Sequence, residues 1–199
     1  MSASQDVGSQ LWWLLSRSAG VVALVLVSVS VLIGLTLAAG LGGPPARRRM
    51  LVSLHEHAAV TGLAAIGLHA VTLLGDTWLK PGLAGISVPF ALSYRPVFTG
   101  LGIIAGYLAA ILGLSFYARR RIGAKRWRKA HRATPVVYVL GVIHTLGAGT
   151  DAGTMWLKAI VLAPAIPAAV LLVARLRKRK PARRRAPAPS RPTPQAAEA

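Results

Sequence analysis

Four histidines within apolar stretches form two pairs whose spacing suits chemistry inside a membrane. His55 and His69 lie 14 positions apart, and His131 and His144 lie 13 positions apart. At roughly 1.5 Å of rise per residue, each pair spans about 20 Å along a helix, which is most of a hydrocarbon core of ~30 Å. Intramembrane imidazoles are costly and usually functional. Two such helices could hold two haems, one near each membrane face, with two histidines on each iron.

The composition of the chain is that of a membrane protein. Of its 199 residues, 54% are hydrophobic and only 15% are charged, and the mean hydropathy is +0.54. The net charge of +19 does not indicate nucleic-acid binding, because nearly all of it lies in loops and a tail that flank apolar segments. No cysteine is present, which excludes thiolate-ligated haem, covalent c-type haem and cysteine-bound iron–sulfur clusters. Histidine is the only strong haem ligand present in number.

Five apolar segments predict an all-α integral membrane bundle of about five transmembrane helices, because open sheet edges cannot face lipid. They cover residues 11–39, 51–74, 97–117, 134–146 and 156–174, and the fourth has the shortest uncharged core. Residues 1–10 are expected to be a short external N-terminus without the basic region of a signal peptide. Residues 11–175 are expected to form the transmembrane domain. Residues 176–199 are predicted to be a disordered cytoplasmic tail, rich in Pro, Arg and Ala and attracted to anionic lipid. No internal repeat is evident.

Basic residues orient the predicted bundle. Lys and Arg cluster at residues 47–49, 119–132 and after residue 174, whereas the opposite ends hold only a few scattered cations. The positive-inside rule places these clusters in the cytoplasm, with the N-terminus outside and the C-terminus inside. The second and fourth helices are then parallel. His55 should therefore pair with His131 near the cytoplasmic face, and His69 with His144 near the outer face.

The direction of the side chains around an ideal helix supports the first pair but not the second. Fourteen residues at about 100° each bring His55 and His69 to within ~40° of one face, but thirteen residues leave His131 and His144 about 140° apart on an ideal helix. Pro135 could reduce this angle, because proline removes a helical hydrogen bond and bends or unwinds the helix there. His57 competes with His55 as a ligand, and its alternative roles are to contact a ligand without binding the iron or to accept a proton.

Haem propionates are anionic and require cations or hydroxyl groups near each iron. Arg17 lies inside the first apolar segment near its outer end, and it is a candidate for binding the propionates of the outer haem. The alternative for Arg17 is a side chain that extends to the lipid headgroups. Arg95 is a weaker outer candidate, and Arg132 and Lys129 are candidates at the inner haem.

At these residues the chain resembles the ferric reductase-like transmembrane domain family. That family includes ferric reductases, NADPH oxidases and the haem-binding subunit of the methionine sulfoxide reductase system. The likeness rests on the two histidine spacings and on the stretches HEHAAVTGLAAIGLHAV and RIGAKRWRKAHRATPVVYVLGVIHTLGAGTD. Respiratory cytochromes b use a related spacing. The resemblance implies that His55, His69, His131 and His144 are the axial iron ligands of two b-type haems.

The expected function is that of a transmembrane di-haem cytochrome b in the bacterial plasma membrane. The resemblance implies electron flow from the cytoplasmic side to an acceptor at the outer face, as the membrane component of an oxidoreductase. The sequence ends after the bundle, so the donor is expected to be a separate flavoprotein or a quinol, and a flavin or quinone could take part through that partner. The alternatives are a histidine-based proton or ion transporter and a non-catalytic membrane scaffold, both without haem.

Overall fold

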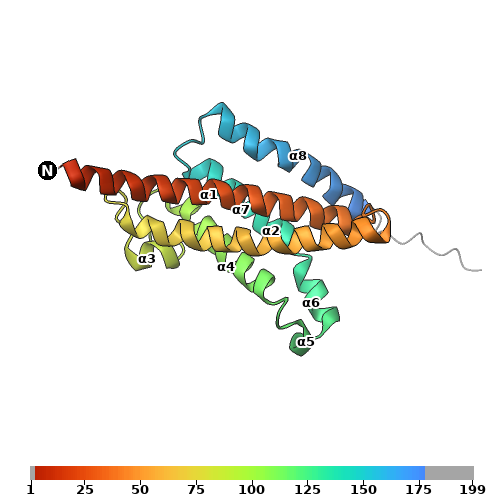
Figure 1. The fold of residues 1–199 in the computed structure, drawn as a ribbon. Helices are drawn as coiled ribbons and strands as arrows, with labels where there is room; N and C mark the ends of the chain where they lie inside the picture. The colour runs from red at the N-terminus through yellow and green to blue at the C-terminus, as the bar shows by residue number, and fades with distance from the viewer. Residues whose placement is uncertain (1–2, 178–199) are drawn as a thin grey trace, which may run out of the picture.

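Helices form nearly all of residues 3–177, the part of the chain that the computed structural model describes, and no strand occurs in that part (Figure 1). Four helices are long and apolar enough to cross a membrane, over Gln10–Ala38, Pro45–Gly75, Pro96–Leu114 and Met155–Arg177. They belong to α1 (Ala3–Ala38), α2 (Pro45–Thr72) with the 3₁₀ turn η1 (Leu73–Gly75), α4 (Pro96–Leu114) and α8 (Met155–Arg177). The predicted all-α membrane bundle is confirmed.

The fourth apolar segment forms a shorter helix. α7 (Thr134–Ala148) has 15 residues, and at roughly 1.5 Å each it extends about 22 Å, less than the thickness of a hydrocarbon core. Three shorter helices lie in the segments that connect these helices. α3 (Gly82–Ser87) lies between α2 and α4, and α5 (Arg119–Ile122) and α6 (Ala124–His131) precede α7. The bundle thus has four long helices and a shorter fifth.

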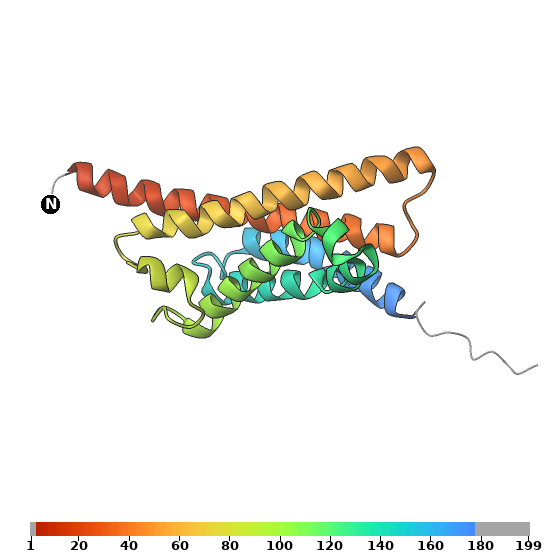
Figure 2. The same cartoon turned by 90° about the horizontal axis from the view of Figure 1, so that it is seen from below.

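Three of the longer helices, α2, α7 and α8, pack on α1. Antiparallel to α1, α2 packs along much of its length, while α8 and α7 pack on α1 from another side and α4 packs mainly on α7 (Figures 1 and 2). Two buried clusters join α1, α7 and α8: Leu24 with Leu157 and Val161, and Leu35 with Tyr138 and Ala168. α2 and α7 pack on α1 and α4 rather than closely on one another.

Large apolar side chains cover the outside of the bundle. Ile111 of α4 and Val170 of α8 are each 63% exposed, and they are two examples of the many exposed Leu, Val and Ile side chains on the long helices. Such a surface is unfavourable in water but suits a helix whose surroundings are lipid chains. The exposed apolar surface therefore agrees with the membrane composition of the sequence.

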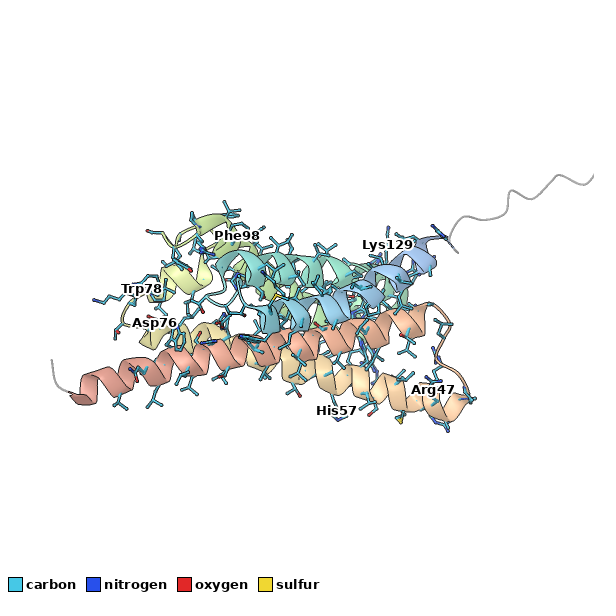
Figure 3. All side chains as sticks on the ribbon, turned by 90° about the horizontal axis from the view of Figure 1, so that it is seen from above. Arg47, His57, Asp76, Trp78, Phe98 and Lys129 are labelled. Atoms are coloured by element: carbon cyan, nitrogen blue, oxygen red, sulfur yellow. The ribbon has the colours of Figure 1, made fainter. Side chains whose placement is uncertain are left out.

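The two ends of the bundle differ in chemistry. Arg47 and Lys129 lie at one end, whereas Asp76, Trp78 and Phe98 lie toward the other (Figure 3). This separation follows the distribution of charge from which the orientation was predicted. α1 already begins at Ala3, so residues 3–10 belong to the same helix as the first apolar segment. The expected external location of residues 1–10 stays a prediction. The predicted tail, residues 176–199, lies outside the described residues except for the last two positions of α8.

A break in the chain resolves the angular difficulty of the second histidine pair. His131 is the last residue of α6, Arg132 and Ala133 form a turn, and Pro135 stands in the first turn of α7. Proline is well tolerated there because the first helical N–H groups have no intrahelical partner. His131 and His144 therefore lie on two separate helices, and the angle calculated for one continuous helix does not apply.

Candidate haem-binding site

The structure brings the four histidines together as two facing pairs. The ring centroids of His55 and His131 are 6.0 Å apart, and those of His69 and His144 are 6.4 Å apart. Both pairs join α2 to the α6–α7 segment across the space between them. The spatial pairing expected from parallel helices is thus observed, and the role of these residues as iron ligands stays a prediction.

The separations suit an iron atom held between two imidazoles. With metal–nitrogen bonds of about 2 Å and roughly 1.2 Å from each nitrogen to its ring centre, two imidazoles bound to one iron from opposite sides would have their centroids about 6.4 Å apart. The observed distances of 6.0 and 6.4 Å lie within about 0.4 Å of that value. No cluster of three or more potential metal-binding side chains occurs among the described residues, but an iron in a haem needs only two from the protein.

Backbone carbonyl groups orient three of the four rings. The Nδ1 atom lies 2.8 Å from the Ser30 carbonyl oxygen in His55, 2.8 Å from that of Ser16 in His69 and 2.9 Å from that of Phe98 in His144. Because a carbonyl can only accept, each Nδ1 must carry the proton and donate it. Each Nε2 then has a free lone pair, which is the form of histidine that binds a metal.

His131 is held differently. Its ring stacks on Trp127 of α6, with centroids 4.9 Å apart and planes 23° apart. Its buried Nδ1 and the buried indole Nε1 of Trp127 have no hydrogen-bond partner at normal geometry. Burial lowers the pKa of His131 and the nearby His55 ring lowers it further, whereas an interaction with the Leu112 backbone of α4 raises it. A shift in this direction favours the neutral imidazole, which is the form that binds a metal.

A cavity of about 170 Å³ lies beside the inner pair. His55 and His131 line it together with Arg132, Thr134 and Arg175, and the rest of the wall is largely apolar. Lys129, the second inner cation expected from the sequence, does not line the cavity, whereas Arg132 does. Two guanidinium groups in the wall of a largely apolar cavity suit a flat apolar ligand with anionic substituents.

Arg17 and Arg95, the cations expected near His69 and His144, interact with other residues of the protein. Arg17 of α1 forms an ion pair with Asp151, which follows α7, and its guanidinium lies over the rings of Trp13 and Trp156. Arg17 directly follows Ser16, whose carbonyl binds the His69 ring, so it lies beside the outer pair. Arg95 donates to the carbonyl of Gly147 near the end of α7. The haem-binding role of Arg17 stays a prediction.

His57 lies apart from both pairs. It is on the outward face of α2 (Figure 3), and its Nδ1 donates to the Ser53 carbonyl one helical turn earlier, at 2.7 Å. No second histidine faces it among the described residues. The arrangement favours His55 over His57 as the residue opposite His131.

Several residues of the site were not identified from the sequence. They are Ser16, Gly20, Ser30 and Gly34 of α1, Gly102 of α4, Trp127 of α6 and Arg175 of α8. One signal was available: Ser-x3-Gly occurs twice in α1 with a spacing of 14 residues, the same as that of His55 and His69. Arg175 ends the last apolar segment at the predicted depth of the inner pair, which was a weaker signal.

Comparison with known protein families gives one match. The family described as ferric reductase like transmembrane component matches residues 19–142 of the chain. The matched segment contains His55, His69 and His131 and ends two residues before His144. No solved structure matches the chain.

Proposed function

Because this chain belongs to the ferric reductase-like transmembrane component family, we propose that it is a di-haem cytochrome b that carries electrons from the cytoplasmic side of the plasma membrane to an acceptor outside. Family membership supports a role in membrane electron transfer. The observation that carries the di-haem proposal is the pair of facing imidazole couples, with ring centroids 6.0 and 6.4 Å apart.

Each couple would hold one haem b. His55 and His131 would bind the inner group, and His69 and His144 the outer one. A haem with two imidazole ligands supplies a one-electron carrier without an open coordination position. The three Nδ1 hydrogen bonds to carbonyl oxygens keep the ligand nitrogens directed into the gap, and they raise the basicity of those nitrogens.

Cations at both ends suit the propionates. Arg132 and Arg175 line the inner cavity, where they would neutralise carboxylates while the apolar wall excludes water. At the outer pair, Arg17 would share its charge between Asp151 and a propionate. These assignments extend the sequence-based expectation for Arg17 and Arg132, and they add Arg175.

The direction of transfer follows from the proposed orientation. The basic segment at residues 119–132 and the inner pair would face the cytoplasm, and the outer pair would face the acceptor. The electron donor is proposed to be a separate flavoprotein or a quinol that reaches the inner pair. Electrons would then pass from the inner to the outer pair, which are separated by about 20 Å along α2.

An absorption spectrum of the purified protein tests the proposal directly. We expect about two non-covalently bound haems per chain and a low-spin bis-imidazole spectrum in both oxidation states. A colourless preparation from haem-sufficient cells, together with a conductance that titrates near ~6.5, would instead favour a histidine-based transporter. A single haem per chain would exclude the two-site version.

A further inference from the structure

α1 carries the same pair of residues twice, facing the two histidines of α2. Ser16 and Gly20 form the first pair, and Ser30 and Gly34 the second, 14 positions later. Fourteen residues return a helix to within about 40° of its starting direction. Both pairs therefore face α2, which runs antiparallel to α1, at the levels of His69 and His55.

The contacts at the two levels are almost identical. At the outer level, the Ser16 carbonyl accepts from Nδ1 of His69 at 2.8 Å, and the Ser16 hydroxyl lies 3.2 Å from the same nitrogen and 3.4 Å from the His69 carbonyl oxygen. At the inner level, the corresponding distances from Ser30 to His55 are 2.8, 3.0 and 3.4 Å.

Each glycine provides the space that its histidine ring occupies. A Cβ atom on Gly20 would lie 3.0 Å from Nδ1 of His69, and one on Gly34 would lie 3.1 Å from Cε1 of His55. Both distances are shorter than ordinary van der Waals contact, so a side chain there would push the ring away from α1. The serine contacts orient each ring, and the glycine lets it lie against the helix backbone.

We propose that α1 is the element that positions one axial ligand of each haem, through Ser16 and Gly20 at the outer site and Ser30 and Gly34 at the inner site. This inference rests on the proposed function. The partner ligands are held by other means: His144 lies against Phe98 and Gly102 of α4, and His131 stacks on Trp127. α1 thus contacts the ligand that α2 supplies at each of the two levels, with the same pair of residue types.

The hydroxyl groups give the inference a measurable consequence. Ser→Ala keeps the backbone carbonyl but removes the hydroxyl oxygen, which lies 3.2 Å from Nδ1 of His69 at Ser16 and 3.0 Å from Nδ1 of His55 at Ser30 as a second acceptor. An acceptor on Nδ1–H increases electron donation from Nε2, which stabilises ferric iron. Ser16→Ala should therefore raise the reduction potential of the outer haem alone, and Ser30→Ala that of the inner haem alone. A purely structural role for these serines would not produce shifts confined to one haem.

The experiment measures haem stoichiometry and potentiometric titrations of Ser16→Ala, Ser30→Ala, Gly20→Val and Gly34→Val. Each valine variant should lose about half of the haem, from its own level only. Gly67→Val is the matched control, because a Cβ at Gly67 of α2 meets nothing within 4 Å although the residue lies two positions from His69. It should retain both haems at wild-type potentials.

The wild-type spectrum in the same series tests the proposed function alone. A wild type without haem would overturn that function and, with it, this inference. A di-haem wild type would leave the function standing, and the inference would then be overturned if both valine variants kept two haems, or lost haem no more selectively than Gly67→Val. If a valine variant does not fold, the serine variants decide, and unchanged or equally shifted potentials would refute the positioning role.

Discussion

At the scale of single residues, the site depends on one ring nitrogen of each histidine being unprotonated and available to bind a metal. A histidine whose Nδ1 is bound by a carbonyl presents Nε2 in one tautomer and one direction, so little entropy is lost when a metal binds. His55, His69 and His144 are fixed in this way. The Nδ1 of His131 has no such bond at normal geometry, and its ring stacks on Trp127 instead.

Alanine substitution of each histidine should group the four ligands by level. His69→Ala and His144→Ala should remove the same outer haem, and His55→Ala and His131→Ala the same inner one, because iron left with one strong ligand is bound weakly and no cysteine can substitute. Each variant should retain about half of the wild-type haem. Haem stoichiometry combined with redox titration identifies which haem is lost.

His57→Ala serves as the control on α2, since its ring faces away from the bundle. It should retain both haems. Loss of a haem in His57→Ala with both retained in His55→Ala would show that the wrong histidine of α2 was chosen. Grouping of His55 with His144 would contradict the parallel arrangement of α2 and α7.

Trp127 should matter for the inner site only. Trp127→Phe keeps an aromatic ring against His131 and should retain the inner haem, whereas Trp127→Ala removes the stacking partner and should make that haem dissociate faster. Transfer of haem to apomyoglobin measures the two dissociation rates separately. Equal acceleration at both levels, or none at either, would contradict this role.

At the scale of helices, the short element α7 solves a geometric problem. A single helix through His131 and His144 would direct the two rings about 140° apart. The turn at Arg132 and Ala133, followed by Pro135 in the first turn of α7, lets α6 direct His131 independently of α7. The resulting shorter helix is held between α1 and α4 and need not span the full hydrocarbon thickness by itself.

The Arg17–Asp151 ion pair joins α1 to the segment between α7 and α8 beside the outer histidines. If Arg17 also acts on the outer haem, Arg17→Gln should lower the potential of that haem, because a nearby positive charge favours the reduced form. Asp151→Asn should raise it for the opposite reason. Redox titration of both variants measures the two shifts, and the inner haem serves as the internal reference.

Two other results would speak against a role of Arg17 at the haem. Identical outer potentials in wild type and Arg17→Gln would leave Arg17 as a structural partner of Asp151 only. A lower melting temperature without a change in potential would lead to the same conclusion.

At the scale of the whole molecule, charge and apolar surface together define an orientation. The apolar side chains exposed on the long helices require lipid around them, and the basic residues at 47–49 and 119–132 gather at one end of the bundle. The positive-inside rule predicts that this end is cytoplasmic. The inner and outer assignments of the two sites both depend on that orientation.

Single cysteines test the orientation cleanly, because the natural chain contains none. Leu83→Cys, at a position 73% exposed in α3, should react with a membrane-impermeant maleimide in intact spheroplasts. Ala124→Cys, at the start of α6, should react only after lysis. The unmodified chain is the control for background labelling, and the reverse pattern would invert the proposed direction of electron flow.

Some properties of this protein follow from the sequence alone because they are local. The length of each apolar run predicts a membrane helix, the position of Lys and Arg predicts its direction, and the spacing of His55 and His69 predicts that both share one helix face. Pairing by depth follows from these properties together, since parallel helices match first with first. For this reason the membrane fold and the levels of the four histidines could be predicted.

Other properties depend on how the helices rotate and pack, and only the tertiary structure decided them. Whether Ser16 or Arg17 of α1 faces His69 depends on the rotation of α1 about its axis relative to α2. A helix that is apolar on all sides gives little indication of that rotation. The break before α7, the Trp127 stack and the approach of Arg175 to the inner cavity likewise join segments distant in sequence. Such contacts arise from the packing of several helices at once, and no single segment of the sequence contains enough information to specify them.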